Sequence, residues 1–391
     1  MTAKEYHAKR LFLLSCIALI TTAMTFAIRA RLEPVYGELF GLNKEQLGWA
    51  FGTAFWGFTL AQFVGGPFVD LIGMKRFVRL AFVLHVIGIV TTIFAHNFWT
   101  LFMGTLFIGV GNGSVEAGCN PLVASIFPDA KTKMLNRFHV WFPGGIVIGS
   151  LVAYLIMDVF KLPWQVLVST LVIPLVTYGI LMLGQKFPQT ERVEMGVSYG
   201  HMWKAILRPL FLIMLFCMLL SAATELTTGQ RISSLLESTN VAPILVLAFI
   251  NGIMAVGRGF AGPIVHRLKT TGMLFFSAVV SMCGLLLMSY VSGAFFTFLA
   301  AGVFAVGICF FWPTMLGFVS ENVPESGALG LSIFGGAGML STSIFLPISG
   351  WFTDSNFTGQ EILRYTAVLP AILIVIFAIV FTVRKRKMKK T

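Results

Sequence analysis

The chain has 391 residues, of which 57% are hydrophobic and only 11% are charged. Soluble proteins carry roughly 25% charged residues, so this composition excludes an ordinary soluble enzyme, and the wealth of apolar residues excludes intrinsic disorder. The formal net charge of +12 would suit a nucleic-acid partner, but no soluble basic domain is present to bind one, and the placement of the charges points elsewhere.

Long apolar segments recur along the whole chain. A helix that crosses a bilayer needs about 20 such residues, whereas outer-membrane strands would show an alternating pattern. The first segment is interpreted as an uncleaved helix, because its apolar run continues to Ile28 and then meets Arg29 where a signal peptide would have small residues. We predict an all-α membrane protein with twelve transmembrane helices, at residues 11–33, 46–69, 77–96, 99–127, 135–159, 164–184, 208–236, 242–265, 271–291, 294–319, 327–352 and 361–383.

The basic residues are distributed unequally between the two sides of the predicted membrane. They cluster at both chain ends and after the second, fourth, sixth and eighth spans, while the other connections hold only Lys44, Lys161 and Arg364. By the positive-inside rule, this pattern predicts a protein of the cytoplasmic (inner) membrane with both termini in the cytoplasm. The positive charge is therefore an orientation signal. The basic residues at 384–390 also suit contact with anionic lipid. No nucleic-acid partner is expected.

Few residues offer catalytic or metal chemistry. The five cysteines stand singly in different spans, which supports neither a disulfide framework nor a zinc site. No phosphate-binding loop is present, so ATP hydrolysis is not expected. An intramembrane enzyme would have only the isolated Glu116 and His139 to work with, and a purely structural or receptor role would leave the charged spans unexplained. We expect no enzyme activity, no catalytic residue, no cofactor and no metal.

The two halves of the sequence echo each other. The longest hydrophilic connection, 185–207, separates six spans from six, and the stretch at 65–70 after span two is similar to that at 261–266 after span eight. We predict an N-terminal bundle at 1–184, a cytoplasmic linker at 185–207 and a C-terminal bundle with a basic tail at 208–391. Two parallel six-helix repeats with a binding site between them at mid-membrane are an architecture of secondary transporters.

The segment from Gly66 to Arg76 resembles the cytoplasmic signature of the major facilitator superfamily. In that family an acidic residue and a basic cluster latch neighbouring helices together. The resemblance implies the major facilitator fold and a gating role for Asp70, Lys75 and Arg76, although Leu71 stands where a basic residue is usual. A further gating residue is predicted at Arg258, near the cytoplasmic end of span eight.

Charged residues within the spans are costly in a membrane and are therefore functional candidates. Arg29 in span one and Glu225 in span seven, the repeat partner of span one, are expected at similar depth. We predict that they face each other across a cavity as an ion pair that breaks during gating; the alternative is that each has a static partner on another helix. Gln230 is predicted to bind a hydroxylated ligand.

Two neighbours of these candidates are assigned differently. Arg31 and Glu33 follow Arg29 by two and four residues, at the outer end of span one. We expect both side chains to extend to the membrane interface, where long charged side chains reach water.

Glu116 lies in the Gly-rich middle of span four, where a carboxyl group can take up and release protons. The alternative is a buried ion pair. His139, at the start of span five, is expected within hydrogen-bonding reach of Glu116; it binds substrate, titrates or simply packs. Asn120 and Pro121 loosen span four and free a carbonyl group for a cavity.

Glu116 followed by Asn120-Pro121 resembles the fucose:proton symporter branch of the superfamily, which includes glucose and galactose permeases. There, this element carries the proton-linked carboxylate, and a Gln in the position of His139 faces the sugar. The resemblance implies proton coupling by Glu116 and a sugar contact at His139. Because a histidine titrates near neutral pH, His139 is predicted as the second proton-coupling residue. That branch has a second carboxylate in helix one, where this chain has Arg29, and this cation would suit an anionic substrate.

Together these observations predict a secondary active transporter, a monomer in the lipid bilayer, that moves a small polar solute by proton symport with alternating access. The leading substrate is a sugar; the alternative is an organic-anion or acidic-sugar carrier or exchanger that uses Arg29. Amide and aromatic groups bind sugars by hydrogen bonding and stacking. The predicted substrate contacts are Arg29, Asn120, His139, Glu225, Gln230, Asn251 and Trp312.

Overall fold

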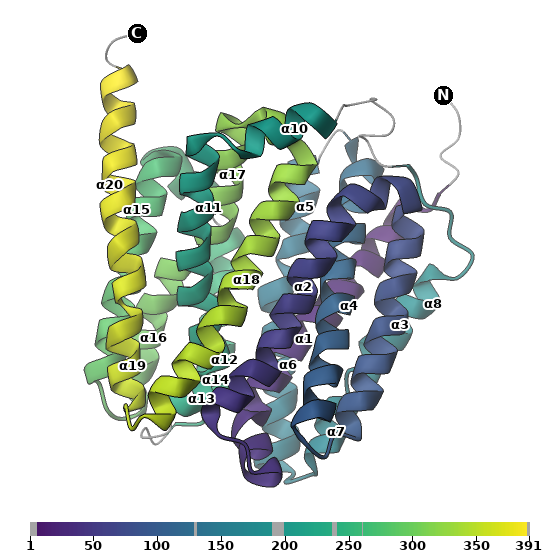
Figure 1. Ribbon diagram of the computed structural model, residues 1–391, viewed down its shortest axis with the longest axis vertical. Helices are drawn as coiled ribbons and strands as arrows, with labels where there is room; N and C mark the ends of the chain where they lie inside the picture. The colour runs from purple at the N-terminus through teal and green to yellow at the C-terminus, as the bar shows by residue number, and fades with distance from the viewer. Residues whose placement is uncertain (1–5, 129–130, 190–198, 237–240, 260, 389–391) are drawn as a thin grey trace.

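The computed structural model describes residues 6–128, 131–189, 199–236, 241–259 and 261–388, and the regular structure in these ranges is entirely helical. The long helices lie side by side between two faces (Figure 1), and α1 (Ala8–Phe40) begins at the same face at which α20 (Val368–Met388) ends. We call this the terminal face and the other the opposite face. The predicted all-α fold is confirmed.

The N-terminal half contains the first six of the predicted spans. Asn43 and Asn97 start two of its helices, because each side chain accepts a hydrogen bond from a backbone N–H three residues later, at 2.8 and 2.9 Å. After α1, the elements of this half are α2 (Lys44–Ile72), α3 (Met74–Ile93), α4 (Phe98–Ile126), α5 (Lys131–His139), α6 (Trp141–Ala153), the π-helical η2 (Tyr154–Val159), α7 (Trp164–Ser169) and α8 (Val172–Met182).

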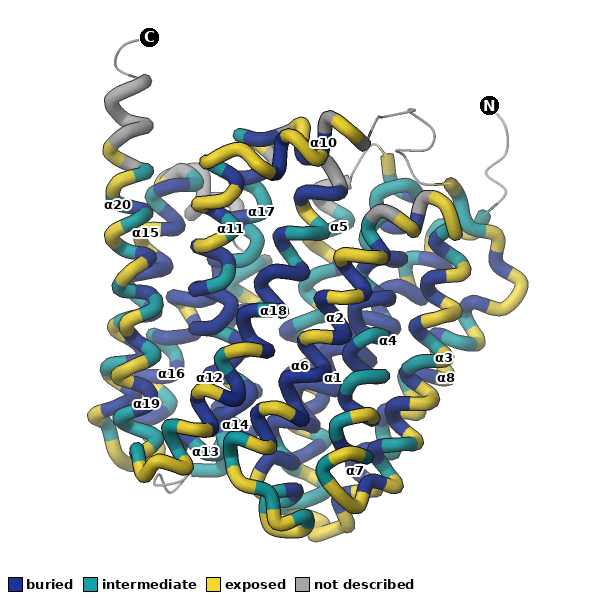
Figure 2. Tube along the Cα trace, in the orientation of Figure 1, coloured by how far each residue is buried: buried dark blue, intermediate teal, exposed yellow. Residues whose placement is uncertain are grey.

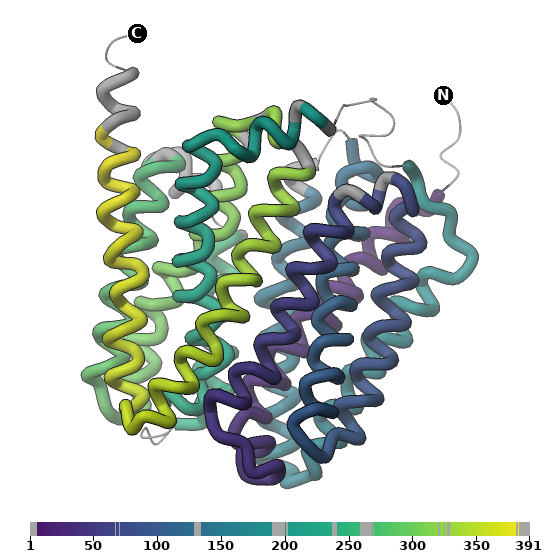
Figure 3. The backbone as a smooth tube through the Cα atoms, in the orientation of Figure 1, coloured from purple at the N-terminus to yellow at the C-terminus, as the bar shows by residue number. Residues whose placement is uncertain are grey.

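The C-terminal half follows the same plan. A short helix on the terminal face, α10 (Tyr199–Ile206), lies within the predicted linker and leads to the first span of this half (Figure 3). The other elements before α20 are α11 (Pro209–Ala222), the π-helical η3 (Ala223–Thr227), α12 (Thr228–Gln230), α13 (Ile232–Leu235), α14 (Pro243–Gly259), α15 (Ala261–Tyr290), α16 (Ala294–Ile308), α17 (Phe311–Asn322), the 3₁₀ turn η4 (Pro324–Ser326), α18 (Gly327–Asp354) and α19 (Gly359–Thr366).

The membrane-spanning character of these helices agrees with the sequence prediction. In the described part of the chain, ten helical stretches are long and apolar enough to cross a bilayer, and Pro243–Arg258 is a shorter apolar helix. With α2 they account for the twelve predicted spans. Large apolar side chains of α3 are exposed, for example those of Val83, Ile87 and Val90. Figure 2 shows exposed stretches along α3, which suits contact with lipid.

Two helices extend well beyond their predicted spans. The first span was predicted to end at residue 33, but α1 continues to Phe40. The ninth span, predicted at 271–291, agrees with the apolar stretch Thr270–Tyr290, but α15 already begins at Ala261, so Arg267 and Lys269 lie in a helix and not in a connection. In both places the apolar run marks only the part of the helix that lies in lipid, while the backbone hydrogen bonds continue beyond it.

The two halves meet along a seam formed by two helix pairs, α2 with α18 and α6 with α14. Hydrogen bonds cross the first pair: the Thr59 hydroxyl donates to the Gly336 carbonyl at 2.8 Å, and the Ser332 hydroxyl donates to the Gln62 carbonyl at 2.8 Å. Gly52 allows close approach, because a β-carbon there would lie 3.1 Å from the Ser343 carbonyl oxygen. The seam therefore places residues of α1 next to residues of α12 and α14.

Candidate functional site

Arg29 joins the two halves at the centre of the seam. Its side chain is buried, and its Nε donates a hydrogen bond to Gln230 Oε1 at 2.7 Å. Gln230 in turn donates to the Phe26 carbonyl at 3.1 Å. The guanidinium lies 4.9 and 5.0 Å from the ring centroids of Phe26 and Phe55, within cation–π range. Its Nη2 has no hydrogen-bond partner among the described residues, which leaves a buried cation with donor capacity to spare.

Glu225 does not form the predicted pair with Arg29. It lies in the π-helical turn η3, and its Oε1 is 3.8 Å from Nη2 of Arg258 on α14. Arg258 also donates from Nε to the Cys309 carbonyl at 3.1 Å. In this structure the place beside Arg29 is taken by Gln230, five residues further along the same span. Glu225 instead has a partner on another helix, which is the alternative that the sequence left open.

Three predicted substrate residues line one cavity between the halves. The cavity is bounded by Phe26 and Ile146 from the N-terminal half and by Glu225, Gln230 and Asn251 among others from the C-terminal half. Its volume of about 30 Å³ leaves room for little more than a single water molecule. A polar solute larger than water therefore enters only when the halves move apart.

Glu116, Asn120 and His139 form a second polar group, within the N-terminal half. Asn120 Nδ2 donates to Glu116 Oε2 at 3.4 Å, and Asn120 Oδ1 lies 3.0 Å from His139 Nε2. The predicted direct bond between Glu116 and His139 is replaced by a bridge through Asn120, because residues four apart on α4 share a face. None of the three lines the central cavity. His139 lies close enough to Arg258 for the two side chains to interact electrostatically across the seam.

The other predicted residues lie apart from these groups. Trp312 packs inside the C-terminal half, where a β-carbon on Gly338 of α18 would come within 2.8 Å of its ring. Lys75 Nζ donates to the Gln185 carbonyl at 2.5 Å, which ties α3 to the chain after α8, and Arg76 is exposed. The side chain of Asp70 lies outside the described residues, so the latch predicted from the family signature stays a prediction.

Sequence reasoning missed a buried ionic cluster near the opposite face. Arg231 Nη1 binds Glu33 Oε1 at 2.5 Å, and both side chains are at most 2% exposed. Arg231 Nη2 donates to the carbonyls of Lys44 and Leu346, at 2.8 and 2.7 Å, and Lys44 Nζ lies 3.8 Å from Glu33 Oε1. We call Glu33, Lys44 and Arg231 the opposite-face latch, because they join α1 and α2 of one half to α13 and α18 of the other.

The expectation that Glu33 extends to the membrane interface was wrong. Because α1 continues to Phe40, Glu33 lies seven residues before its end and is fully buried. Two glycines make room for the arginine: a β-carbon at Gly48 or at Gly350 would lie 2.7 or 2.5 Å from Arg231 Nη2. The signal that could have revealed the pair is an acid and a base at the outer ends of the repeat-related spans one and seven, with glycines on the facing helices.

A second group that the sequence did not reveal is a neutral network inside the N-terminal half. His85 lies 3.0 Å from the Tyr178 hydroxyl and 2.9 Å from Asn112 Oδ1, and Asn112 donates to the Thr25 hydroxyl at 3.0 Å. Since Asn112 Oδ1 only accepts, Nε2 of His85 carries the proton in this arrangement. The network links α8, α3, α4 and α1, and it fixes α4 one turn before Glu116.

Two sequence comparisons relate this chain to known proteins. A family model described as Major Facilitator Superfamily matches residues 11–327. A D-xylose transporter of Levilactobacillus brevis is 24% identical over 166 residues, which is 42% of this chain but only 35% of that relative, so the match spans about a third of the relative's length.

Solved structures resemble the chain over nearly its whole length. A D-xylose-proton symporter has a TM-score of 0.76 at 14% identity and covers 94% of this chain and 97% of its own. A nucleoside transporter has a TM-score of 0.75 at 14% identity, with coverages of 95% and 100%. The fucose:proton symporter of E. coli has a TM-score of 0.68 at 16% identity, with coverages of 94% and 98%. At these identities the likeness shows the fold alone.

Proposed function

We propose, since this chain belongs to the major facilitator superfamily and is a membrane transporter rather than an enzyme, that it moves a small polar solute, a sugar, by proton symport with alternating access. The observation that carries the proposal is the cavity between the halves, with Glu225, Gln230 and Asn251 on one wall and Phe26 on the other. A carboxylate and two amides suit sugar hydroxyls, and an aromatic ring suits the apolar face of a sugar.

Glu116 is the proposed site of proton coupling. Its described contact is a long hydrogen bond from the neutral amide of Asn120, at 3.4 Å, whereas Glu225 faces an arginine. A carboxyl group that lacks a fixed cation changes its protonation state at lower cost, and Asn120 connects it to His139, a second proton acceptor. Lys75 and Arg76 keep their proposed gating role together with Asp70.

We propose that the terminal face is cytoplasmic and that the protein is a monomer of the cytoplasmic membrane, with bundles at 1–184 and 208–391. The orientation is supported by the basic residues that follow the even-numbered spans. In this orientation the opposite-face latch closes the outer end of the pathway. The shared fold of a D-xylose-proton symporter and of the fucose:proton symporter supports the choice of solute and ion.

The test is D-xylose uptake by the purified protein in liposomes with an imposed inward proton gradient. Accumulation that a protonophore abolishes is expected, and Gln230→Ala and Asn251→Ala should each reduce it at least about tenfold if each amide binds a hydroxyl. Asn322→Ala is the matched control: Asn251 and Asn322 both donate to the carbonyl four residues earlier, but Asn322 is remote from the cavity. Uptake that does not depend on the proton gradient and that is unchanged in both Gln230→Ala and Asn251→Ala would disprove the proposal.

The coupling site is tested separately. Glu116→Gln should keep solute exchange across the liposome membrane while it removes gradient-driven accumulation, because a glutamine cannot carry the proton. Full accumulation by this variant would show that Glu116 is not the coupling site.

A second candidate function is favoured by Arg29. This buried cation has a neutral partner, Gln230, and an Nη2 without a described partner, so a carboxylate on the substrate would complete its bonding. The protein would then carry an acidic sugar or another organic anion. D-Glucuronate that competes with D-xylose in wild-type liposomes but not in Arg29→Gln liposomes would favour this function; equal competition in both would reject it.

A further inference from the structure

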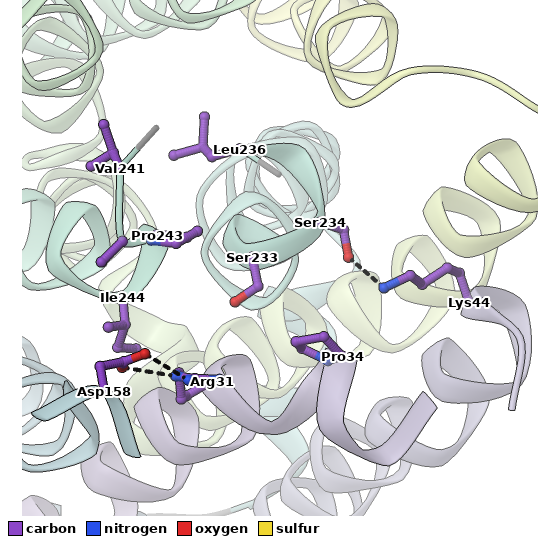
Figure 4. A pocket seen from close by; sticks show the side chains of 11 residues that line it. Arg31, Pro34, Lys44, Asp158, Ser233, Ser234, Leu236, Val241, Pro243 and Ile244 are labelled. Carbon is purple, nitrogen blue, oxygen red and sulfur yellow. Dashed lines mark hydrogen bonds and ion pairs between the residues drawn. The ribbon is translucent and has the colours of Figure 1, made fainter. Parts of the chain in front are cut away.

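A cavity of about 260 Å³ opens near the opposite face, beside the latch (Figure 4). Both halves form its walls: Arg31 comes from α1, Lys44 from the start of α2, Asp158 from η2, and Ser233 and Ser234 from α13. It is much larger than the closed central cavity of about 30 Å³. Pockets that bind small molecules have volumes of about 300 Å³ and more. This cavity therefore approaches the volume of a pocket for a small ligand such as a monosaccharide.

The polar wall of this opposite-face pocket is already organised. Arg31 binds Asp158 through two hydrogen bonds, at 2.8 and 3.2 Å, and Lys44 Nζ donates to the Ser234 hydroxyl at 3.1 Å. Ser233 is held by its hydrogen bond to the Ala30 carbonyl at 2.9 Å. Figure 4 shows the Arg31–Asp158 pair and the Lys44–Ser234 pair at two separate places around the pocket, with Pro34 and Ser233 between them and Val241 away from both. The wall is therefore fixed before any solute binds.

The charge of the lining is positive. Among the described lining residues, Arg31 and Lys44 are cations and Asp158 is a carboxylate, which leaves a net charge of +1. Because Asp158 is paired with Arg31, this charge lies at Lys44. Glu33 does not cancel it, because it lies 3.8 Å from Lys44 but only 2.5 Å from Arg231. A lysine ammonium has three donors, so the contacts with Ser234 and Glu33 leave one for a ligand. The side chains of Arg31, Lys44 and Asp158 are 20–29% exposed, so an aqueous solute reaches them.

We propose that the opposite-face pocket is a second binding site, which takes a small hydroxylated carboxylate of about monosaccharide size. The carboxylate lies on Lys44, where a charge-assisted hydrogen bond is strong. The hydroxyl groups extend past Ser233 toward Arg31 and Asp158, and the apolar edge packs against Val241. The site is independent of the proposed function, because it requires neither transport nor the residues of the central cavity.

The test is equilibrium binding of radiolabelled D-glucuronate to the purified full-length protein in detergent. Val241→Trp should fill the pocket from its apolar side and remove one class of binding. Val256→Trp, the same substitution at a position of α14 that is 62% exposed, should not. Lys44→Gln should weaken that class at least about tenfold, as expected for the loss of a charge-assisted hydrogen bond.

Two further measurements decide between this pocket and the central site. Arg29→Gln should keep the class of binding that Val241→Trp removes, even if transport is lost. D-Glucose, a neutral probe, should bind to it at least about tenfold more weakly than D-glucuronate. Three results would each overturn the proposal. The first is D-glucuronate binding with wild-type affinity and stoichiometry in both Val241→Trp and Lys44→Gln. The others are equal binding of the two probes and no D-glucuronate binding by the wild type. Failure of D-xylose uptake would affect only the proposed function.

Discussion

Arg231 and Arg29 are two buried arginines that join the halves of the molecule, yet their surroundings differ in kind. Arg231 binds a buried carboxylate and two backbone carbonyls, whereas Arg29 has the neutral amide of Gln230, two aromatic rings and an Nη2 without a described partner. Arg231 Nε also has no hydrogen-bond partner among the described residues, so the difference between the two arginines lies in the counter-ion. A buried charge that is paired with a carboxylate is costly to separate from it. A buried charge without a counter-ion is suited to a ligand that supplies one. The comparison favours closure of the opposite face as the role of Arg231, and it supports the substrate contact that we propose for Arg29.

Removing Arg231 should have the largest effect on stability. Arg231→Gln leaves the buried Glu33 carboxylate with only the Lys44 ammonium, at 3.8 Å, beside it, and the loss of one partner of a buried ion pair costs about 3–5 kcal/mol. The apparent midpoint of thermal unfolding in detergent should fall strongly. The double variant Glu33→Gln/Arg231→Gln should be more stable than Arg231→Gln alone, since no uncompensated charge remains. If the single variant unfolds like the wild type, the latch does not hold the halves together.

Filling the slot around Arg231 should have a moderate effect. In Gly48→Ala the new β-carbon would lie 2.7 Å from Arg231 Nη2 and 2.5 Å from the Pro347 backbone, so α2 and α18 must separate. Overpacking of this kind costs about 1–3 kcal/mol. Gly317→Ala is the control, because a β-carbon there meets nothing within 4 Å. Equal unfolding midpoints for the two variants would contradict the described fit.

Removing Arg29 should change stability little and transport greatly. Arg29→Gln deletes a buried cation that has no carboxylate partner, so we expect the unfolding free energy to change by about 1 kcal/mol or less. Solute uptake in liposomes should fall at least about tenfold. The substrate loses its contact with Arg29, or Gln230, the neighbour of Arg29, loses the hydrogen bond that holds it in place. A loss of stability like that of Arg231→Gln would show that the two arginines have the same structural role.

The smallest effect is expected at an exposed ion pair, Arg208 with Glu325, whose N–O distance is 3.0 Å. The pKa of the Glu325 carboxyl is held below its usual value by its own backbone N–H and then by the hydrogen bond from Arg208. A lowered carboxyl pKa adds stability at neutral pH that is lost as the pH falls through the acid range. Because solvent screens this pair, Arg208→Gln should leave the unfolding midpoint at pH 7 unchanged. A clear drop would show that the pair is not screened.

Much of the site could be predicted from local signals. Glu116, Asn120 and His139 lie together because the first two are four residues apart on one helix and the third begins the next span. Gln230, Glu225 and Asn251 were selected as polar groups within apolar spans, and one cavity unites them. Their partners could not be predicted, because the rotation of each helix about its axis decides whether Arg29 meets Glu225 or Gln230.

The sequence by itself determined the long apolar helices, since lipid forces each long apolar run to satisfy its own backbone hydrogen bonds. It also predicted their division into two halves. The positions of the intramembrane charges were also visible in it. Only the tertiary structure decided that Glu33 is buried, that Arg231 is its partner and that Trp312 packs away from the cavity. Such contacts join residues about 200 positions apart in the chain, and they depend on where helices end and how closely their glycines let them approach, which no local pattern encodes.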